Sequence, residues 1–186
     1  MNIRENKNSL QALILTGLFA AIIYLGIWVL RIPVPAMVGR PFIHFGNTLT
    51  AVAILILGYR NGMLAGIIGL GGFDILNGYA ATSWLTMLEV FVVASIISIV
   101  YKGMHYQDSK ANIIIIGIIA GITKIGTTYL VSIVEALIIG TSLKVAYIAS
   151  FMSLPATVVN SISTAICTPL LYFAFTKAGK KLLRIN

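Results

Sequence analysis

The sequence predicts an all-α integral membrane protein with six transmembrane helices and with both termini in the cytoplasm. Hydrophobic residues make up 59% of the 186 residues and charged residues only 10%, and the mean hydropathy is +0.98. Long apolar runs recur from residue 10 to residue 176. A soluble domain of this length has too little interior to bury so many apolar side chains. We therefore expect a lipid bilayer around the chain.

The six spans follow from the apolar runs, because a helix needs about 20 residues to cross a hydrocarbon core of roughly 30 Å. Charges, prolines and glycines mark where each run ends. A short second and third span meet at Gly58-Tyr59-Arg60-Asn61-Gly62, a sequence that favours a hairpin over one kinked helix. The expected spans form one membrane domain over residues 1–186, at about 10–30, 44–58, 62–78, 84–101, 111–139 and 145–176.

The first span is read as a helix and not as a signal peptide, because no small-residue cleavage site closes it before Trp28. It carries small residues spaced by four, Thr16 with Ala20 and Gly17 with Ala21. Such faces let helices approach closely in lipid. The partner of this face is either another helix of the chain or another protein.

The segment from Arg31 to Phe42 is too irregular for a span and too apolar for an ordinary linker, since it contains three prolines. It is expected on the outer side, either folded over a cavity as a lid or resting at the lipid headgroups.

The orientation follows from lysine and arginine, which stay preferentially in cytoplasmic loops. With the N-terminus inside, the outer side holds only Arg31, Arg40 and Lys144. The remaining loop cations are then cytoplasmic: Arg4, Lys7, Arg60, Lys102, Lys110, Lys177, Lys180, Lys181 and Arg184. The net charge of +8 is thus mostly a topology signal, and we expect no nucleic-acid partner.

Polar residues inside the apolar spans indicate a binding site, because a charge at the centre of a span costs roughly 2.5–3.5 kcal/mol on insertion scales. Depth along each helix, at about 1.5 Å per residue, places these residues together in the outer leaflet. The candidate substrate-binding residues are His44, Asn47, Asp74, Asn77, Trp84, Glu89, Lys124, Tyr129 and Asn160.

Plainer roles remain open for several of them. Asp74 has the alternative of a solvated carboxylate at a helix end, and His44 that of an interfacial capping residue. Glu89 and Lys124 either pair with each other to satisfy burial or contact a ligand.

Enzymatic classes are disfavoured by what the sequence contains. Cys167 is the single cysteine, so we expect neither a disulfide nor a cysteine metal cluster, and no cofactor. The two histidines lie far apart in the expected topology, and no phosphate-binding GxxxxGK[ST] sequence is present. We expect any ATP to be hydrolysed by a partner.

Several motifs together resemble the substrate-binding S components of energy-coupling factor (ECF) vitamin transporters. They are His44-Phe-Gly-Asn47 at the start of the second span and the 58–62 turn, followed by Gly66, Gly69 and Asp74. The last span adds Pro155-Ala-Thr-Val-Val-Asn160 and Pro169-Leu-Leu-Tyr172. With six helices in fewer than 200 residues, the resemblance covers most of the chain.

The resemblance implies a multi-pass protein of the bacterial cell membrane that captures a vitamin in its outer half. It also implies docking on a transmembrane coupling subunit driven by two cytoplasmic ATPase subunits, with Thr16, Gly17, Ala20 and Ala21 as the candidate docking face. Overall likeness favours pyridoxine or a hydroxymethylpyrimidine-like heterocycle as cargo, stacked on Trp84, Tyr129 and either Phe42 or Tyr79. Lys124 keeps the anion pantothenate as an alternative, and a structural membrane subunit is the alternative of another class.

Overall fold

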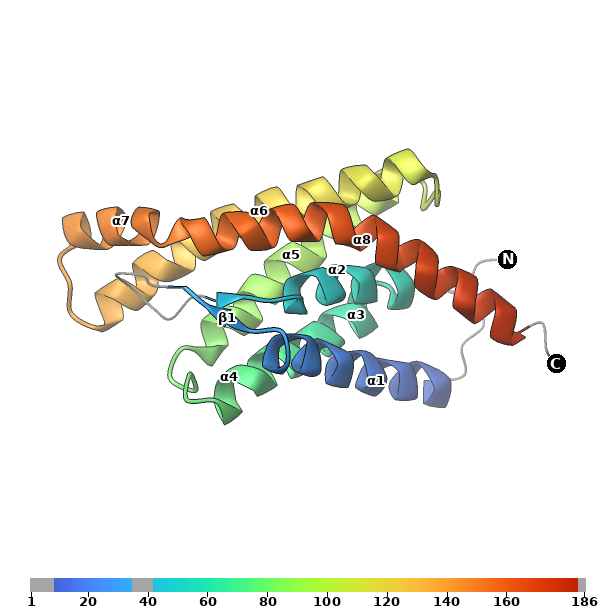
Figure 1. The fold of residues 1–186 in the computed structure, drawn as a ribbon, viewed down its shortest axis with the longest axis horizontal. Helices are drawn as coiled ribbons and strands as arrows, with labels where there is room; N and C mark the ends of the chain where they lie inside the picture. The colour runs from blue at the N-terminus through green and yellow to red at the C-terminus, as the bar shows by residue number, and fades with distance from the viewer. Residues whose placement is uncertain (1–8, 35–41, 184–186) are drawn as a thin grey trace.

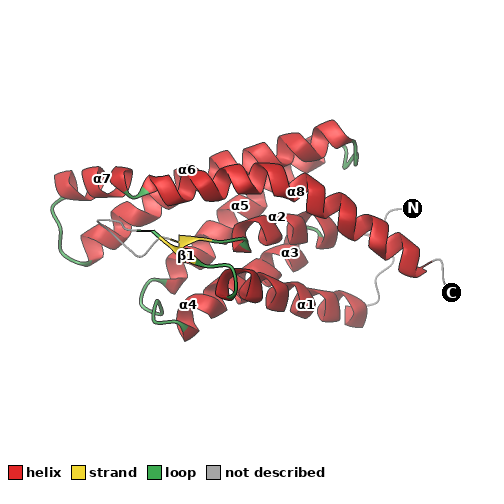
Figure 2. Cartoon of the chain, viewed as in Figure 1, coloured by secondary structure: helices red, strands yellow, loops and turns green. Residues whose placement is uncertain are grey.

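The computed structural model describes residues 9–34 and 42–183, which are almost entirely helical (Figure 1, Figure 2). Arg4, Lys7, Arg40 and Arg184 lie outside this part, as do residues 35–41 of the expected lid. The elements in chain order are α1 (Ser9–Trp28), β1 (Ile32–Pro33), β2 (Phe42–Ile43), α2 (Gly46–Leu57), α3 (Tyr59–Gly66), the π-helical η1 (Ile67–Gly71), α4 (Gly72–Leu76), α5 (Ser83–Gly103), α6 (Lys110–Ile138), α7 (Leu143–Met152) and α8 (Leu154–Leu183).

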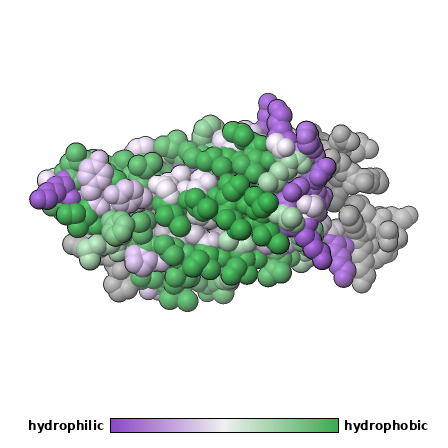
Figure 3. Space-filling view, turned by 90° about the horizontal axis from the view of Figure 1, so that it is seen from above, coloured by the Kyte–Doolittle hydropathy of each residue, from purple (hydrophilic) through white to green (hydrophobic). Residues whose placement is uncertain are grey.

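Four helices in the described residues are long and apolar enough to cross a membrane, namely Leu10–Trp28, Ser83–Gly103, Lys110–Ile138 and Leu154–Gly179. Helix α2, with 12 residues, is shorter than a full span, and α3, η1 and α4 follow one another without a gap from residue 59 to residue 76. On the face drawn in Figure 3, apolar side chains form a broad belt and hydrophilic ones gather toward the two ends. This pattern is that of an all-α membrane protein.

The turn at residues 58–62 is a helical hairpin. Gly58 ends α2 with φ 84°, a left-handed conformation that a side chain would strain. Four residues on, a Cβ on Gly62 would lie 2.3 Å from Cα of Ile54. The two glycines therefore let α2 and α3 turn sharply and pack backbone to backbone.

The expected helix at 145–176 is divided into α7 and α8, which meet at Ser153. The physical reason is Pro155, whose ring lacks a backbone donor and disfavours helical geometry in the residue before it. The first turn of a helix tolerates proline, and so α8 starts there as a new helix.

The core lies where α2 meets its neighbours. One cluster joins α1, α2, the α3–η1–α4 run and α5 around Phe73 and Ile23, both fully buried. A second joins α2, α5, α6 and α8 around Ile97 and Ile113. In Figure 1 the start of α1 and the end of α8 lie at one end of the molecule, together with the α2–α3 turn and the α5–α6 connection. The short β1–β2 pair and the α4–α5 connection lie toward the other end.

Candidate ligand-binding site

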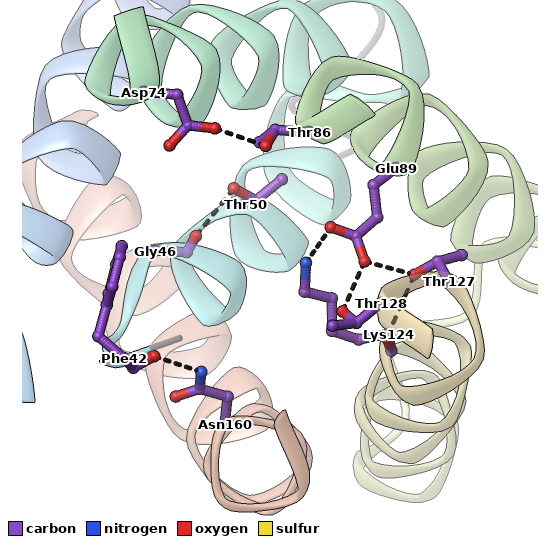
Figure 4. Close-up of polar contacts among 10 residues, drawn as sticks. All are labelled: Phe42, Gly46, Thr50, Asp74, Thr86, Glu89, Lys124, Thr127, Thr128 and Asn160. Atoms are coloured by element: carbon purple, nitrogen blue, oxygen red, sulfur yellow. Dashed lines mark hydrogen bonds and ion pairs between the residues drawn. The ribbon is translucent and has the colours of Figure 1, made fainter. Parts of the chain in front are cut away.

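A polar cavity of about 160 Å³ opens between α2, α4, α5, α6 and α8, beside the β1–β2 pair. Figure 4 shows polar side chains entering this region from several helices. The lining residues are Phe42, His44, Asn47, Asp74, Tyr79, Thr82, Thr86, Glu89, Lys124, Thr128, Val131, Ser132, Glu135, Ser153, Ala156, Thr157 and Asn160. Most of them carry hydroxyl, amide or charged groups, which is unusual within an apolar helical bundle.

Six of the nine residues that the sequence marks as candidates line this cavity. They come from the residue that follows β2 and from α2, α4, α5, α6 and α8, so they are far apart in sequence. These six are His44, Asn47, Asp74, Glu89, Lys124 and Asn160.

Glu89 and Lys124 form an ion pair between α5 and α6. Glu89 is only 7% exposed, and its Oε1 also accepts hydrogen bonds from the hydroxyls of Thr127 at 2.8 Å and Thr128 at 2.7 Å. A buried carboxylate needs several donors to offset the loss of water. Of the two roles left open by the sequence, pairing is observed, and both residues still line the cavity (Figure 4).

Asn160 of α8 clamps the strand β2 at the cavity wall. Its Oδ1 accepts the backbone N–H of His44 at 3.0 Å, and its Nδ2 donates to the carbonyl of Phe42 at 2.9 Å. The Nδ1 atom of His44 accepts the N–H of Gly46 at 3.0 Å, so that nitrogen carries no proton. His44 thus satisfies the first turn of α2 while lining the cavity.

Asp74 lies at the end of the α3–η1–α4 run and accepts a hydrogen bond from the hydroxyl of Thr86 on α5 (Figure 4). Glu135 of α6 also lines the cavity. The hydroxyl of Thr82, in the α4–α5 connection, donates to the carbonyl of Tyr79 at 3.4 Å.

Three sequence candidates lie away from the cavity. Asn77 donates to the carbonyl of Phe73 at 2.9 Å, Trp84 is 51% exposed on the apolar surface, and Tyr129 packs on a small cluster around Ile133. The sequence predicts how deep each of these residues lies along its helix. It does not predict toward which side of the helix the side chain points, and this decides whether the residue lines the cavity.

The aromatic residues that do line the cavity are Phe42 and Tyr79, whose ring centroids lie 6.2 Å apart. Phe42 also approaches the ring of His44 at 5.1 Å. A flat ring in the cavity would therefore meet aromatic surface from β2 and from the α4–α5 connection.

Several lining residues were not among the sequence candidates: Thr82, Thr86, Thr128, Ser132, Glu135 and Thr157. A signal for them exists in the sequence, because residues 124, 128, 132 and 135 recur at helical spacing on one face of α6. Residues 82, 86 and 89 recur in the same way at the start of α5. Threonine and serine are common in membrane helices, which hides this pattern among ordinary packing residues.

The four candidate docking residues of α1 divide between two faces. Thr16 and Ala20 are buried inside the bundle at 5% and 4% exposure, whereas Gly17 and Ala21 are exposed. A Cβ added to Gly17 would meet nothing within 4 Å in the described structure. One small-residue pair therefore packs within the chain, and the other faces outward.

Comparison with known proteins gives one match. The family model described as ECF-type riboflavin transporter, S component, matches residues 7–177. Neither the curated proteins nor the solved structures contain a match to the chain.

Proposed function

The chain belongs to the ECF-type riboflavin transporter S component family, and we propose that its cargo is a small single-ring nitrogen heterocycle of the pyridoxine or hydroxymethylpyrimidine class. As an S component it is a vitamin-binding transporter subunit of the cell membrane and not an enzyme. The observation that carries the choice of cargo is the polar cavity of about 160 Å³ with Phe42 and Tyr79 in its wall.

The size of the cavity supports a compact ligand. Pockets for drug-sized molecules measure about 300–1,000 Å³, so this cavity suits one ring with short substituents. Aromatic rings favour offset or edge contacts with a flat partner, and the surrounding hydroxyls and amides supply the donors and acceptors that hydroxymethyl groups and ring nitrogens require.

The charges in the cavity argue against pantothenate. Its carboxylate would need a free cation, but the ammonium of Lys124 is already bound to Glu89. Asp74 and Glu135 would repel an anion. A ligand that is neutral or basic fits this lining better.

Riboflavin is the second candidate, because it is the vitamin that the description of the matching family names. Its three fused rings and ribityl chain require more room than the cavity described here offers. The two candidates therefore differ in the volume that the site must provide.

The distribution of cations supports an orientation with both termini in the cytoplasm. The end of the molecule at which α1 starts and α8 ends (Figure 1) also holds four cations: Arg60 at the start of α3, Lys102 at the end of α5, Lys110 at the start of α6 and Lys177 near the end of α8. Positive loops stay preferentially inside. This orientation puts the cavity in the outer half, where α2 and the α3–α4 run complete a six-segment membrane domain.

For delivery, we propose that the outward-facing pair Gly17 and Ala21 docks on a transmembrane coupling subunit, which two ATPase subunits drive. Replacing Gly17 with leucine should leave vitamin binding intact and abolish uptake by cells that supply the coupling module, because the side chain would enter only the docking surface. The comparison variant Ala20→Leu should impair both, since Ala20 is buried. Unchanged uptake by the Gly17 variant would contradict this docking face.

The cargo is tested by calorimetry on the purified protein with pyridoxine, hydroxymethylpyrimidine, pantothenate, thiamine and riboflavin. We expect the tightest binding from one of the first two. Tighter binding of riboflavin would replace the proposed cargo with the second candidate, and no binding by any ligand would favour a structural subunit.

A further inference from the structure

The cavity holds more acid than its own cation neutralises. Three of the five acidic residues of the sequence line it, namely Asp74, Glu89 and Glu135. Lys124 neutralises Glu89, and within the described residues no second ion pair is found. Asp74 and Glu135 therefore line the cavity without a cationic partner among the described residues, and Asp74 accepts a hydrogen bond from the hydroxyl of Thr86.

A partly buried carboxylate without a cation is costly, and a second one in the same cavity adds to the cost because like charges repel. Asp74 and Glu135 line the same cavity of about 160 Å³, together with the Glu89–Lys124 pair. A positively charged group between the first two would offset their repulsion. A cationic ligand would supply such a group.

An unpaired amide independently indicates that the cavity is built for a ligand. Nδ2 of Asn47 is buried without a hydrogen-bond partner in the described structure, and Asn47 lines the cavity. The hydroxyl residues Ser132 and Thr157, at 8% and 5% exposure, line it as well. Buried polar groups are normally paired. A polar ligand would complete the amide of Asn47 and would meet the hydroxyls of Ser132 and Thr157.

The aromatic side of the cavity is compatible with a cation. The rings of Phe42 and Tyr79 present π faces, and a cation near such a face is attracted to it. Phe42 already makes one cation–π contact within the chain, because the guanidinium carbon of Arg31 lies 5.7 Å from its ring centroid.

We propose that Asp74 and Glu135 form an acidic pair that selects a ligand carrying a protonated amino group over the same ring carrying a hydroxyl. A charged amine donates short, charge-assisted hydrogen bonds to carboxylates. Ser132 and Thr157 bind the neutral substituents of the ring. This inference rests on the proposed function and narrows its cargo to amino-substituted heterocycles.

The test compares two ligands that differ in one group. Pyridoxamine and pyridoxine share a ring and differ by an aminomethyl against a hydroxymethyl substituent, and only the aminomethyl group carries a proton and a positive charge at neutral pH. Each is titrated calorimetrically into the purified full-length protein and into its Asp74→Asn and Glu135→Gln variants. The matched control is Asp108→Asn, which changes an exposed carboxylate outside the cavity, bound to Tyr101 and Tyr172.

We expect an amine ligand to bind about 10- to 100-fold more tightly than its hydroxyl counterpart, the usual range for a hydrogen bond to a charged group. Asp74→Asn and Glu135→Gln should each remove most of that preference, and Asp108→Asn should retain it. Thermal unfolding of each variant separates lost binding from lost folding.

Equal affinity for the amine and hydroxyl ligands would overturn the acidic pair and leave the proposed function standing. The same follows if both carboxylate variants keep the preference while remaining folded. Binding of riboflavin in place of every single-ring ligand would instead overturn the proposed cargo, and this inference with it.

Discussion

Replacing Lys124 with methionine should destabilise the protein strongly, because it leaves the carboxylate of Glu89 buried without its cation. Glu89 is 7% exposed and Lys124 17%, so little water reaches the pair. Removing one member of a buried ion pair costs about 3–5 kcal/mol. The hydroxyls of Thr127 and Thr128 still donate to Glu89, but neither carries a charge.

That cost corresponds to a fall of about 6–20 °C in the unfolding temperature, since 1 kcal/mol shifts a chain of this size by about 2–4 °C. The assay is thermal unfolding in detergent. The double variant Glu89→Gln/Lys124→Met should recover at least half of the loss, because it removes the unpaired charge along with the cation. Lys144→Met, at an exposed position, should change stability by less than about 0.5 kcal/mol. A Lys124→Met protein as stable as the original would refute the reasoning.

Three further predictions each replace a single residue, and the first two are paired with a matched site. Gly62→Ala should destabilise the protein by about 1–3 kcal/mol, because the new Cβ would lie 2.3 Å from the α2 backbone. Gly72→Ala, whose Cβ would meet nothing within 4 Å, should leave the unfolding temperature unchanged or slightly raised. Thr168→Val should be neutral or stabilising, since its fully buried hydroxyl has no partner among the described residues. Thr164→Val should cost about 1–3 kcal/mol, because it breaks the 3.1 Å hydrogen bond to Thr48 of α2. Equal unfolding temperatures of the two variants would contradict this. Asn160→Leu should abolish ligand binding measured by calorimetry, because it releases β2 from α8; binding at the original affinity would show that the clamp is dispensable.

The sequence predicts the membrane character and the helical hairpin at residues 58–62 because both depend on local properties. Apolar runs report the bilayer directly, and Gly58 with φ 84° is a conformation that few other residues adopt. The break at Ser153 has a local signal as well, in Pro155. It is missed when helices are divided by hydrophobicity alone, because the residues on both sides are apolar.

The candidate site is predictable to the extent that charge is expensive in lipid. Glu89 and Lys124 have few other ways to be accommodated, and both line the cavity. The same argument does not apply to Trp84 and Asn77, which carry no charge. An aromatic ring is also stable at the membrane surface, and Trp84 is exposed. An amide near a helix end can bond to nearby backbone, as Asn77 does. Thr157 is the opposite case: it lines the cavity, and a lone threonine in an apolar helix carries no distinctive signal.

The cavity itself results from a change along one face of α6. At Gly117 and Gly121, a Cβ would lie 2.9 Å and 2.8 Å from carbonyl oxygens of α8, so the two helices touch there backbone to backbone. Further along the same face, at helical spacing, come Lys124, Thr128 and Ser132, which line the cavity. Larger side chains cannot fit between helices at backbone contact, so the polar part of the face must lie where the helices leave room for it. The order of small and polar residues on this one helix therefore sets both where the bundle closes and where a ligand can enter.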